Sequence, residues 1–129
     1  LNREPVADFF DAIVLGDGEE VILEIAEVVR DTKKSGASRQ DVLSLLSDCA
    51  GVYVPSFFVP HYNGAELTAI KSLKQGYESV RRRVLPRLAG PEEGGKPLVP
   101  IVKPVHDRLG VEIARGCTRG CRFCQAGII

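Results

Sequence analysis

Three cysteines lie close together in the stretch RGCTRGCRFCQAG. Cys117, Cys121 and Cys124 form a C-x3-C-x2-C array, with a glycine before each of the first two and Phe123 before the third. Thiolates this close in sequence can bind one small inorganic group, and zinc and iron are the common candidates. The array therefore indicates a metal site.

The spacing of the cysteines separates the candidate metals. Structural zinc takes four protein ligands, typically in two separated pairs, and the sequence has no second pair. The bacterial ferredoxin pattern has four cysteines, as C-x2-C-x2-C-x3-C. Three cysteines in one loop leave one iron of a 4Fe-4S cluster without a protein ligand, so that a small molecule can bind it. We expect this reactive cluster, and a zinc site or an incidental group of thiols is the alternative.

The pattern C-x3-C-x-Φ-C, with an aromatic residue at Φ, resembles the signature of the radical S-adenosylmethionine enzymes. The resemblance implies that Cys117, Cys121 and Cys124 ligate a 4Fe-4S cluster and that Phe123 lies near the adenine. It also implies that S-adenosylmethionine binds the open iron through its amino and carboxylate groups. Reduction would cleave it to methionine and a 5′-deoxyadenosyl radical, which abstracts hydrogen from a substrate. A small-protein reductant such as flavodoxin or ferredoxin is implied in the same way.

Glycines and arginines surround the three cysteines. We expect Gly116 and Gly120 to contribute to cofactor binding, because a loop around a cluster needs close backbone approach and positive φ. Arg115, Arg119 and Arg122 could offset the negative charge of a thiolate-ligated cluster. The alternative for these arginines is that they are solvated.

The wider string VEIARGCTRGCRFCQAG looks most like radical enzymes that carry a cobalamin-binding-like domain ahead of the barrel. The turn GDGEE at residues 16–20 is similar to a turn near the end of that domain. The histidine motif that would ligate cobalt would lie upstream, so the sequence does not test cobalamin binding. Methyl transfer and methylthio transfer both stay open, and the substrate is unknown.

Four other features of the sequence could have carried chemistry. Cys49 is predicted to be a buried structural thiol rather than a fourth ligand. His61 is expected at the surface, and His106 is a weak zinc candidate because a predicted strand separates it from the cysteines. Three consecutive arginines at residues 81–83 could grip RNA, but a solvated or ion-paired face is favoured.

Composition narrows the classes of protein. Seventeen basic and seventeen acidic residues give a formal net charge of zero, which argues against a general nucleic-acid or anionic-membrane surface. No apolar run approaches the ~20 residues of a membrane-spanning helix. The cysteine usage suits a reducing cytoplasm. Because the sequence starts with Leu1 and has no methionine, we expect a fragment of a longer enzyme, inactive by itself.

The first half of the sequence predicts a strand followed by two helices. Residues 9–15, FFDAIVL, are typical of a strand buried on both faces of a parallel sheet, and the acids of GDGEE are expected to cap the next helix. That helix should end before Gly36 and bury a stripe of Val21, Ile22, Ile25, Val28 and Val29. A second helix over residues 38–50 should begin with a Ser38–Asp41 capping box and bury Val42, Leu45, Leu46 and Cys49.

The second half predicts strands and a linker. Residues 52–54 and 57–62 should be extended, Asn63-Gly64 should form a two-residue hairpin turn, and residues 66–73 should return. A third strand is expected within residues 77–85. Residues 86–104 hold five prolines and three glycines and predict a linker. Residues 111–114 predict a short strand that leads into the cysteine loop.

The expected fold is α/β, or α+β overall. Residues 1–51 would be the C-terminal part of a Rossmann-like, cobalamin-binding-type domain, and residues 52–85 a β-rich connecting region with a hairpin. After the linker, residues 105–129 would supply the first strand and cluster loop of a radical S-adenosylmethionine barrel. Two rivals are a non-catalytic iron-sulfur or zinc module and an RNA or protein interaction domain.

Overall fold

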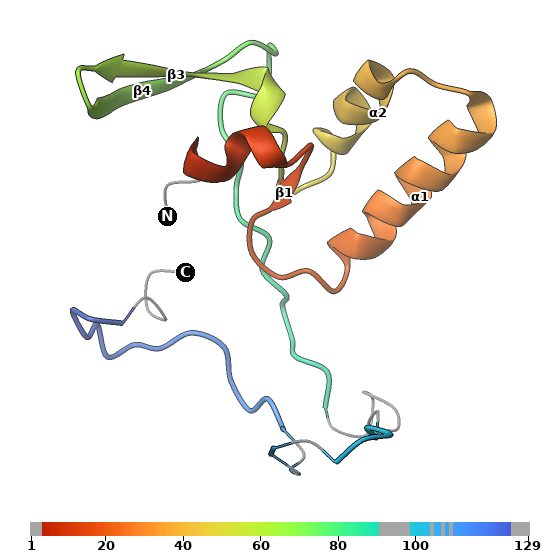
Figure 1. Ribbon diagram of the computed structural model, residues 1–129, viewed down its shortest axis with the longest axis vertical. Coiled ribbons are helices and arrows are strands. Elements are labelled where there is room, and N and C mark those ends of the chain that lie inside the picture. Colours follow the sequence, from red (N-terminus) through yellow and green to blue (C-terminus); the bar gives the residue numbers. More distant parts are fainter. Residues whose placement is uncertain (1–3, 91–98, 104, 107, 109, 125–129) are drawn as a thin grey trace. The chain divides into compact units, whose positions relative to one another are not determined.

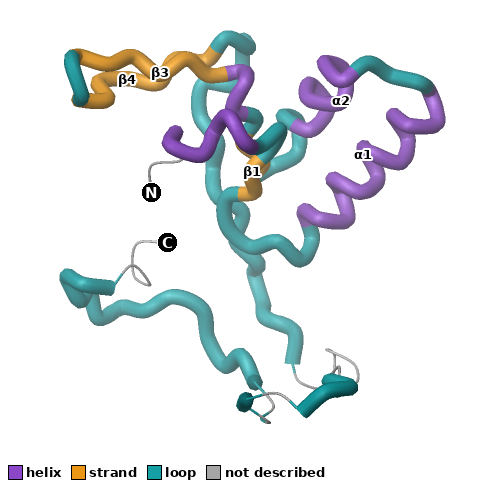
Figure 2. Tube along the Cα trace, viewed as in Figure 1, coloured by secondary structure: helices purple, strands orange, loops and turns teal. Residues whose placement is uncertain are grey.

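The computed structural model describes residues 4–90, 99–103, 105–106, 108 and 110–124 (Figure 1). The chain divides into two units, Leu1–Val84 and Leu85–Ile129. Every helix and strand assigned in the described residues belongs to the first unit, and the described part of the second unit is drawn as loop (Figure 2). The first unit is a small mixed α+β structure with two two-stranded antiparallel sheets.

The first α-helix, α1, spans Val21–Ser35 and agrees closely with its prediction. Lys33 and Lys34 lie in its last turn, and Gly36 ends it in the left-handed conformation, with φ of 68°. Of its predicted buried stripe, Val21 is buried, Ile25, Val28 and Val29 are half-buried, and Ile22 is 56% exposed. The expected acidic cap is also wrong, because the side chain of Glu20 at the N-cap makes no capping hydrogen bond.

The second α-helix, α2, spans Arg39–Leu46, and the predicted capping box is confirmed. The Asp41 amide donates to Ser38 Oγ at 3.2 Å, and the Ser38 amide donates to Asp41 Oδ2 at 3.1 Å. The helix is shorter than predicted and ends at Leu46. Its most buried leucines are Leu43 and Leu46, whereas Leu45 is 46% exposed, so the predicted stripe was wrong at Leu45.

The predicted strand over residues 9–15 is wrong in both extent and pairing. Residues Glu4–Phe9 form a 3-10 helix, η1, and Phe9 is 81% exposed. Only Ile13–Val14 forms a strand, β1, which pairs antiparallel with β2, Val52–Tyr53. An apolar run fixes neither the length of a strand nor the direction of its partner, because both depend on residues far away in the sequence.

The predicted strand over residues 77–85 is reduced to one bridge. Arg83 forms an isolated parallel β-bridge with Gly16. The Arg83 amide donates to Leu15 O at 2.7 Å, and the Arg83 carbonyl accepts from Asp17 N at 3.0 Å. Within the described residues this is the only parallel pairing, so a Rossmann-like sheet is not shown. Residues 111–114 form no strand, and no barrel strand is present in the described part of the second unit.

A β-hairpin follows the 3-10 helix η2, Pro55–Phe57, as expected. Its strands are β3, Phe58–Asn63, and β4, Glu66–Ser72. Asn63 pairs with Glu66, so the turn residues are Gly64 and Ala65, one position later than predicted. Gly64 has φ of 61°, as the first central residue of a II′ turn requires.

The core of the first unit is formed by residues of α1, α2, β2 and η2 together with Val54, Phe58 and Tyr77. The Tyr53 and Phe58 rings stack with centroids 4.7 Å apart. The buried Tyr77 hydroxyl donates to Val52 O at 2.5 Å and accepts from Val54 N at 3.1 Å. The buried hydrophobic residues are Val21, Leu43, Leu46, Val52, Tyr53, Val54, Phe57, Phe58 and Tyr77. None of the described helices is long and apolar enough to cross a membrane.

Candidate functional site

The cysteine loop is irregular, and two glycines determine its path. Gly116 and Gly120 adopt φ of 74° and 64°, in the left-handed region that other residues seldom adopt. A Cβ at Gly120 would meet no atom within 4 Å, so the backbone conformation, not crowding, favours glycine there. The positive φ that the sequence predicted for these glycines is confirmed, but contact with a cofactor stays a prediction.

Two local hydrogen bonds shape the loop around the cysteines. The Cys124 amide donates to Cys121 O at 3.1 Å and closes a turn over Arg122 and Phe123. The Arg119 amide donates to Cys117 Sγ at 3.5 Å. The loop is therefore folded back twice within eight residues, 117–124, by main-chain donors.

The three thiols are accessible but are not gathered as a ligand set. Cys117 and Cys121 are exposed and Cys124 is partly buried, and all are free thiols. Among the described residues no group of three or more His, Cys, Asp or Glu side chains is placed to hold a metal ion. The ligand role of the cysteines therefore stays a prediction, and His106, which is exposed, joins no such group either.

The donor set still fits an iron-sulfur cluster. Thiolates are the ligands that such clusters use, and the three thiols share one loop whose turns need no helix or strand to form. A ligand loop commonly takes its final geometry only when the metal binds. Phe123 is 92% exposed, so its ring face is accessible to a planar group such as adenine.

The arginines around the cysteines differ in their interactions. Arg115 Nη2 donates to Glu112 Oε2 at 2.9 Å, so this carboxylate already offsets its charge. Arg119 and Arg122 are exposed. The charge available to a cluster should therefore come mainly from Arg119 and Arg122.

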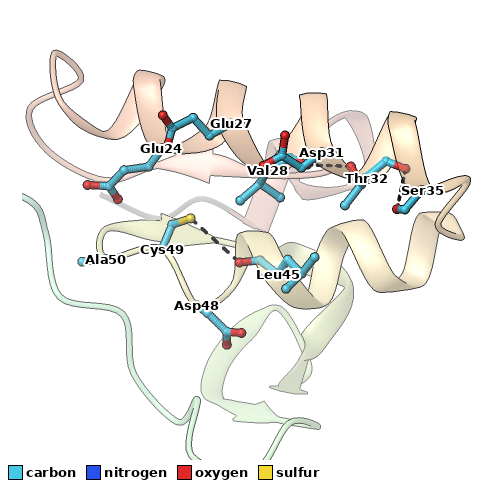
Figure 3. Close-up of a pocket in the computed structure, with 10 residues that line it drawn as sticks. All are labelled: Glu24, Glu27, Val28, Asp31, Thr32, Ser35, Leu45, Asp48, Cys49 and Ala50. Carbon is cyan, nitrogen blue, oxygen red and sulfur yellow. Dashed lines mark hydrogen bonds between the residues drawn. The ribbon is translucent and has the colours of Figure 1, made fainter.

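A pocket in the first unit lies between α1 and α2 and opens to solvent (Figure 3). Its volume is about 610 Å³, and carboxylates surround an apolar floor that includes Val28, Leu45 and Cys49. Burial raises the pKa of the Cys49 thiol, with smaller contributions from neighbouring carboxylates. A neutral, partly buried thiol is a poor nucleophile, which agrees with the structural role predicted for Cys49.

The acidic rim of this pocket is largely neutralised. Glu24 contacts Arg83, Asp48 contacts Lys74 Nζ at 2.8 Å, and Asp31 contacts Arg30. Of the four acidic residues that line the pocket, three are paired in this way within the described residues and Glu27 is not, so the rim offers a cationic ligand one carboxylate instead of a cluster. We assign it no chemistry.

The side chain of Arg83 forms ion pairs, which account for one member of the run of three arginines whose role the sequence left open. Its guanidinium donates to Glu24 Oε2 at 3.0 Å and to Glu20 Oε2 at 2.9 Å. These hydrogen bonds, the one to Glu24 first, raise the pKa of Arg83 above its ordinary value. The ion-paired face favoured by the sequence is confirmed at Arg83, and that side chain is not free to bind a phosphate. The pairing was invisible in the sequence because 59 and 63 positions separate the partners.

Comparison with known proteins adds a separate observation on the first 55 residues. No curated protein and no solved structure matches the chain. A family model described as "Radical SAM proteins, N-terminal" matches residues 1–55, which include η1, β1, both α-helices and β2. The match ends before the cysteine loop begins. Residues 1–55 are thus similar to the N-terminal region of radical S-adenosylmethionine proteins.

Proposed function

We propose that this sequence belongs to a radical S-adenosylmethionine enzyme in which Cys117, Cys121 and Cys124 hold a 4Fe-4S cluster. The observation that carries the proposal is the C-x3-C-x-Φ-C array in a chain whose residues 1–55 match the N-terminal region of radical S-adenosylmethionine proteins. The two segments do not overlap, so each supports the same family independently.

The residues of the cysteine loop have different roles in binding the cluster and the cofactor. The three thiolates would hold the cluster, and with three protein ligands one iron would stay open to S-adenosylmethionine. Gly116 and Gly120 let the backbone approach the cluster closely, and the Phe123 ring offers a face for the adenine to stack on. When bound, the cluster supplies the electron that cleaves the sulfonium to methionine and a 5′-deoxyadenosyl radical.

The wider proposal concerns the setting of this chemistry. A cluster with an open iron requires a reducing compartment, so we assign the protein to the cytoplasm with a small-protein reductant such as flavodoxin or ferredoxin. The turn at residues 16–20 resembles a turn near the end of cobalamin-binding-like domains, and this resemblance supports such a domain over residues 1–51. The substrate supplies a hydrogen atom to the radical, and methyl transfer and methylthio transfer are the two reaction types that the resemblance offers.

Metal analysis of the full-length protein tests the ligand assignment. After anaerobic reconstitution with iron and sulfide, we expect close to four irons and four sulfides per chain for one cluster of the 4Fe-4S type. Single alanine variants at Cys117, Cys121 and Cys124 should lose most of the iron. Cys49→Ala is the matched control, because it removes a cysteine from the same chain outside the loop, and it should retain the cluster.

Two outcomes would overturn the assignment. Stable uptake of zinc in place of iron would identify a closed structural metal site. Loss of iron in Cys49→Ala to the same extent as in the loop variants would show that the fourth position is a protein ligand. That site could not bind S-adenosylmethionine at an open iron.

A further inference from the structure

The outer edge of β4 presents main-chain groups that point away from the hairpin. The Leu73 amide donates to Phe57 O at 2.8 Å, at the base of the hairpin. Hydrogen-bonded and non-hydrogen-bonded pairs alternate along an antiparallel ladder, so the pair of Pro60 with Ile70, three positions further on, is not hydrogen-bonded. A proline, which has no N–H, fits this position. The main-chain N–H and C=O of Ile70 therefore point to the outer edge of β4.

The two edges of the hairpin differ in their protection. Pro60 places a residue without an N–H on the outer edge of β3, which blocks the pairing of a further strand there. β4 contains no proline, and within the described residues the main-chain groups of Ile70 form no hydrogen bond with another segment. The hairpin extends away from α1 and α2 (Figure 1). The edge of β4 can thus accept another strand.

The sequence of β4 fits a second copy of itself. In an antiparallel, two-fold pair centred on Ile70, this residue of each copy would face its equivalent, and their outward N–H and C=O groups would exchange hydrogen bonds. Lys71 of each copy would then lie opposite Ala69 of the other, so that no like charges meet. A pair centred one residue later would set Lys71 against its own equivalent, and like charges directly opposite each other are destabilising.

We propose that β4 pairs with β4 of a second copy of this chain, antiparallel and centred on Ile70. The formal net charge of zero adds no overall repulsion between two copies. The β-bulge at Thr68 ends the regular edge on one side, so the paired segment is short and the dimer is weak. The pairing involves none of the four cysteines and does not depend on the proposed function.

A proline at position 70 tests the edge. Ile70→Pro removes the outward N–H but no hydrogen bond of the hairpin, because the pair of Ile70 with Pro60 is not hydrogen-bonded. Ile70→Val is the matched control, since it keeps the N–H and a β-branched side chain. Sedimentation velocity of the full-length protein over a range of concentrations measures association. We expect a concentration-dependent dimer for the wild type and Ile70→Val, and a monomer for Ile70→Pro.

Substitutions at Ala69 test the register without changing the backbone. The contact of Ala69 with Lys71 of the second copy would occur twice in a two-fold dimer. Ala69→Glu should therefore strengthen the dimer and Ala69→Lys weaken it, with dissociation constants roughly tenfold apart at low salt. Each variant controls for the added side-chain bulk of the other. The difference should shrink as salt is added.

The outcomes separate the possible occupants of this edge. A full-length wild type that stays monomeric at high micromolar concentration would overturn the proposal, whether solvent or another strand of the full-length chain covers β4. A dimer that persists in Ile70→Pro would place the interface elsewhere. If Ile70→Pro fails to fold, the comparison at Ala69 decides. Equal dissociation constants for Ala69→Glu and Ala69→Lys would contradict the pairing centred on Ile70.

Discussion

The carbonyl oxygen of Arg83 occupies the space where a side chain on Gly16 would begin. A Cβ built on Gly16 would lie 2.0 Å from that oxygen, and Gly16 has φ of 103°. Gly51, which directly precedes β2, also approaches Arg83, since its Cβ would lie 2.9 Å from the Arg83 Cβ. The backbone at Arg83 therefore passes close to two glycines, one just after β1 and one just before β2.

The close approach predicts a large effect of a single methyl group. Gly16→Ala adds a Cβ that overlaps the Arg83 carbonyl and forces a non-glycine residue to positive φ, and strain of these two kinds should cost roughly 2–4 kcal/mol of unfolding free energy. Gly18→Ala is the matched control, because a Cβ there meets no atom within 4 Å. It should stay within about 0.5 kcal/mol of the wild type. Urea unfolding measures both, and equal stability of the two variants would contradict the close approach.

A second prediction concerns the side chain of Arg83. Its guanidinium bonds Glu20 and Glu24 of the α1 region, so Arg83→Ala should lower the urea midpoint, and Arg83→Lys should recover only part of the loss because it cannot form the fork. The difference from the wild type should shrink as salt is added. Arg82→Ala, at an exposed neighbour, should change the midpoint little. If Arg83→Ala equals Arg82→Ala, the ion pairs contribute nothing to stability.

The Ser38–Asp41 capping box predicts how the stability of the fold changes with pH in the acidic range. Hydrogen bonds from the Ser38 side chain and then its backbone lower the pKa of Asp41. A lowered folded-state pKa gives stability that is present above the ordinary carboxyl range, about pH 4, and is lost as the pH falls through the folded value. Asp41→Asn should therefore flatten the decline in stability between about pH 5 and pH 3.

The serine of the same box gives a comparison at neutral pH. Ser38→Ala should cost about 1 kcal/mol at pH 7, the usual effect of losing an N-cap side chain. Thermal unfolding followed over pH measures both variants. An Asp41→Asn profile that runs parallel to the wild type at every pH would contradict the linkage.

A third kind of prediction concerns the thiols of the metal-free protein. Burial raises the pKa of Cys49, whereas Cys117 and Cys121 are exposed. Because the thiolate is the reactive form, iodoacetamide at pH 8 should modify Cys117 and Cys121 before Cys49. Peptide mass spectrometry over time gives the order. If Cys49 were modified as fast as Cys121, the pocket between α1 and α2 that contains Cys49 would have to open readily.

The sequence predicted best those elements whose signals are local. The end of α1 at Gly36 and the Ser38–Asp41 capping box each depend on a few adjacent residues, and both predictions are confirmed. The hairpin was found, but its turn lies one residue later than expected. Its register also shifts between His61 and Tyr62, where Thr68 Oγ1 donates to His61 O at 2.9 Å. A bulge of this kind leaves no trace in the alternation of apolar residues.

The errors occurred where distant residues decide the structure. Ile13–Val14 is a strand only because Val52–Tyr53 pairs with it, and Arg83 contributes one bridge instead of a strand because its backbone fits between two glycines. For the candidate site, the positive φ that the sequence predicted for Gly116 and Gly120 is confirmed, whereas the ligand role of the three cysteines stays a prediction. The sequence could not predict the Arg119–Cys117 hydrogen bond, which depends on the local fold of the loop.

The most direct test of the central claim is electron paramagnetic resonance of the reduced, reconstituted full-length protein with and without S-adenosylmethionine. If the three-cysteine loop leaves one iron open, the cofactor binds that iron and the signal of the cluster changes on its addition. Addition of buffer alone should leave the signal unchanged. A reduced cluster whose signal is identical with and without S-adenosylmethionine would contradict the assignment.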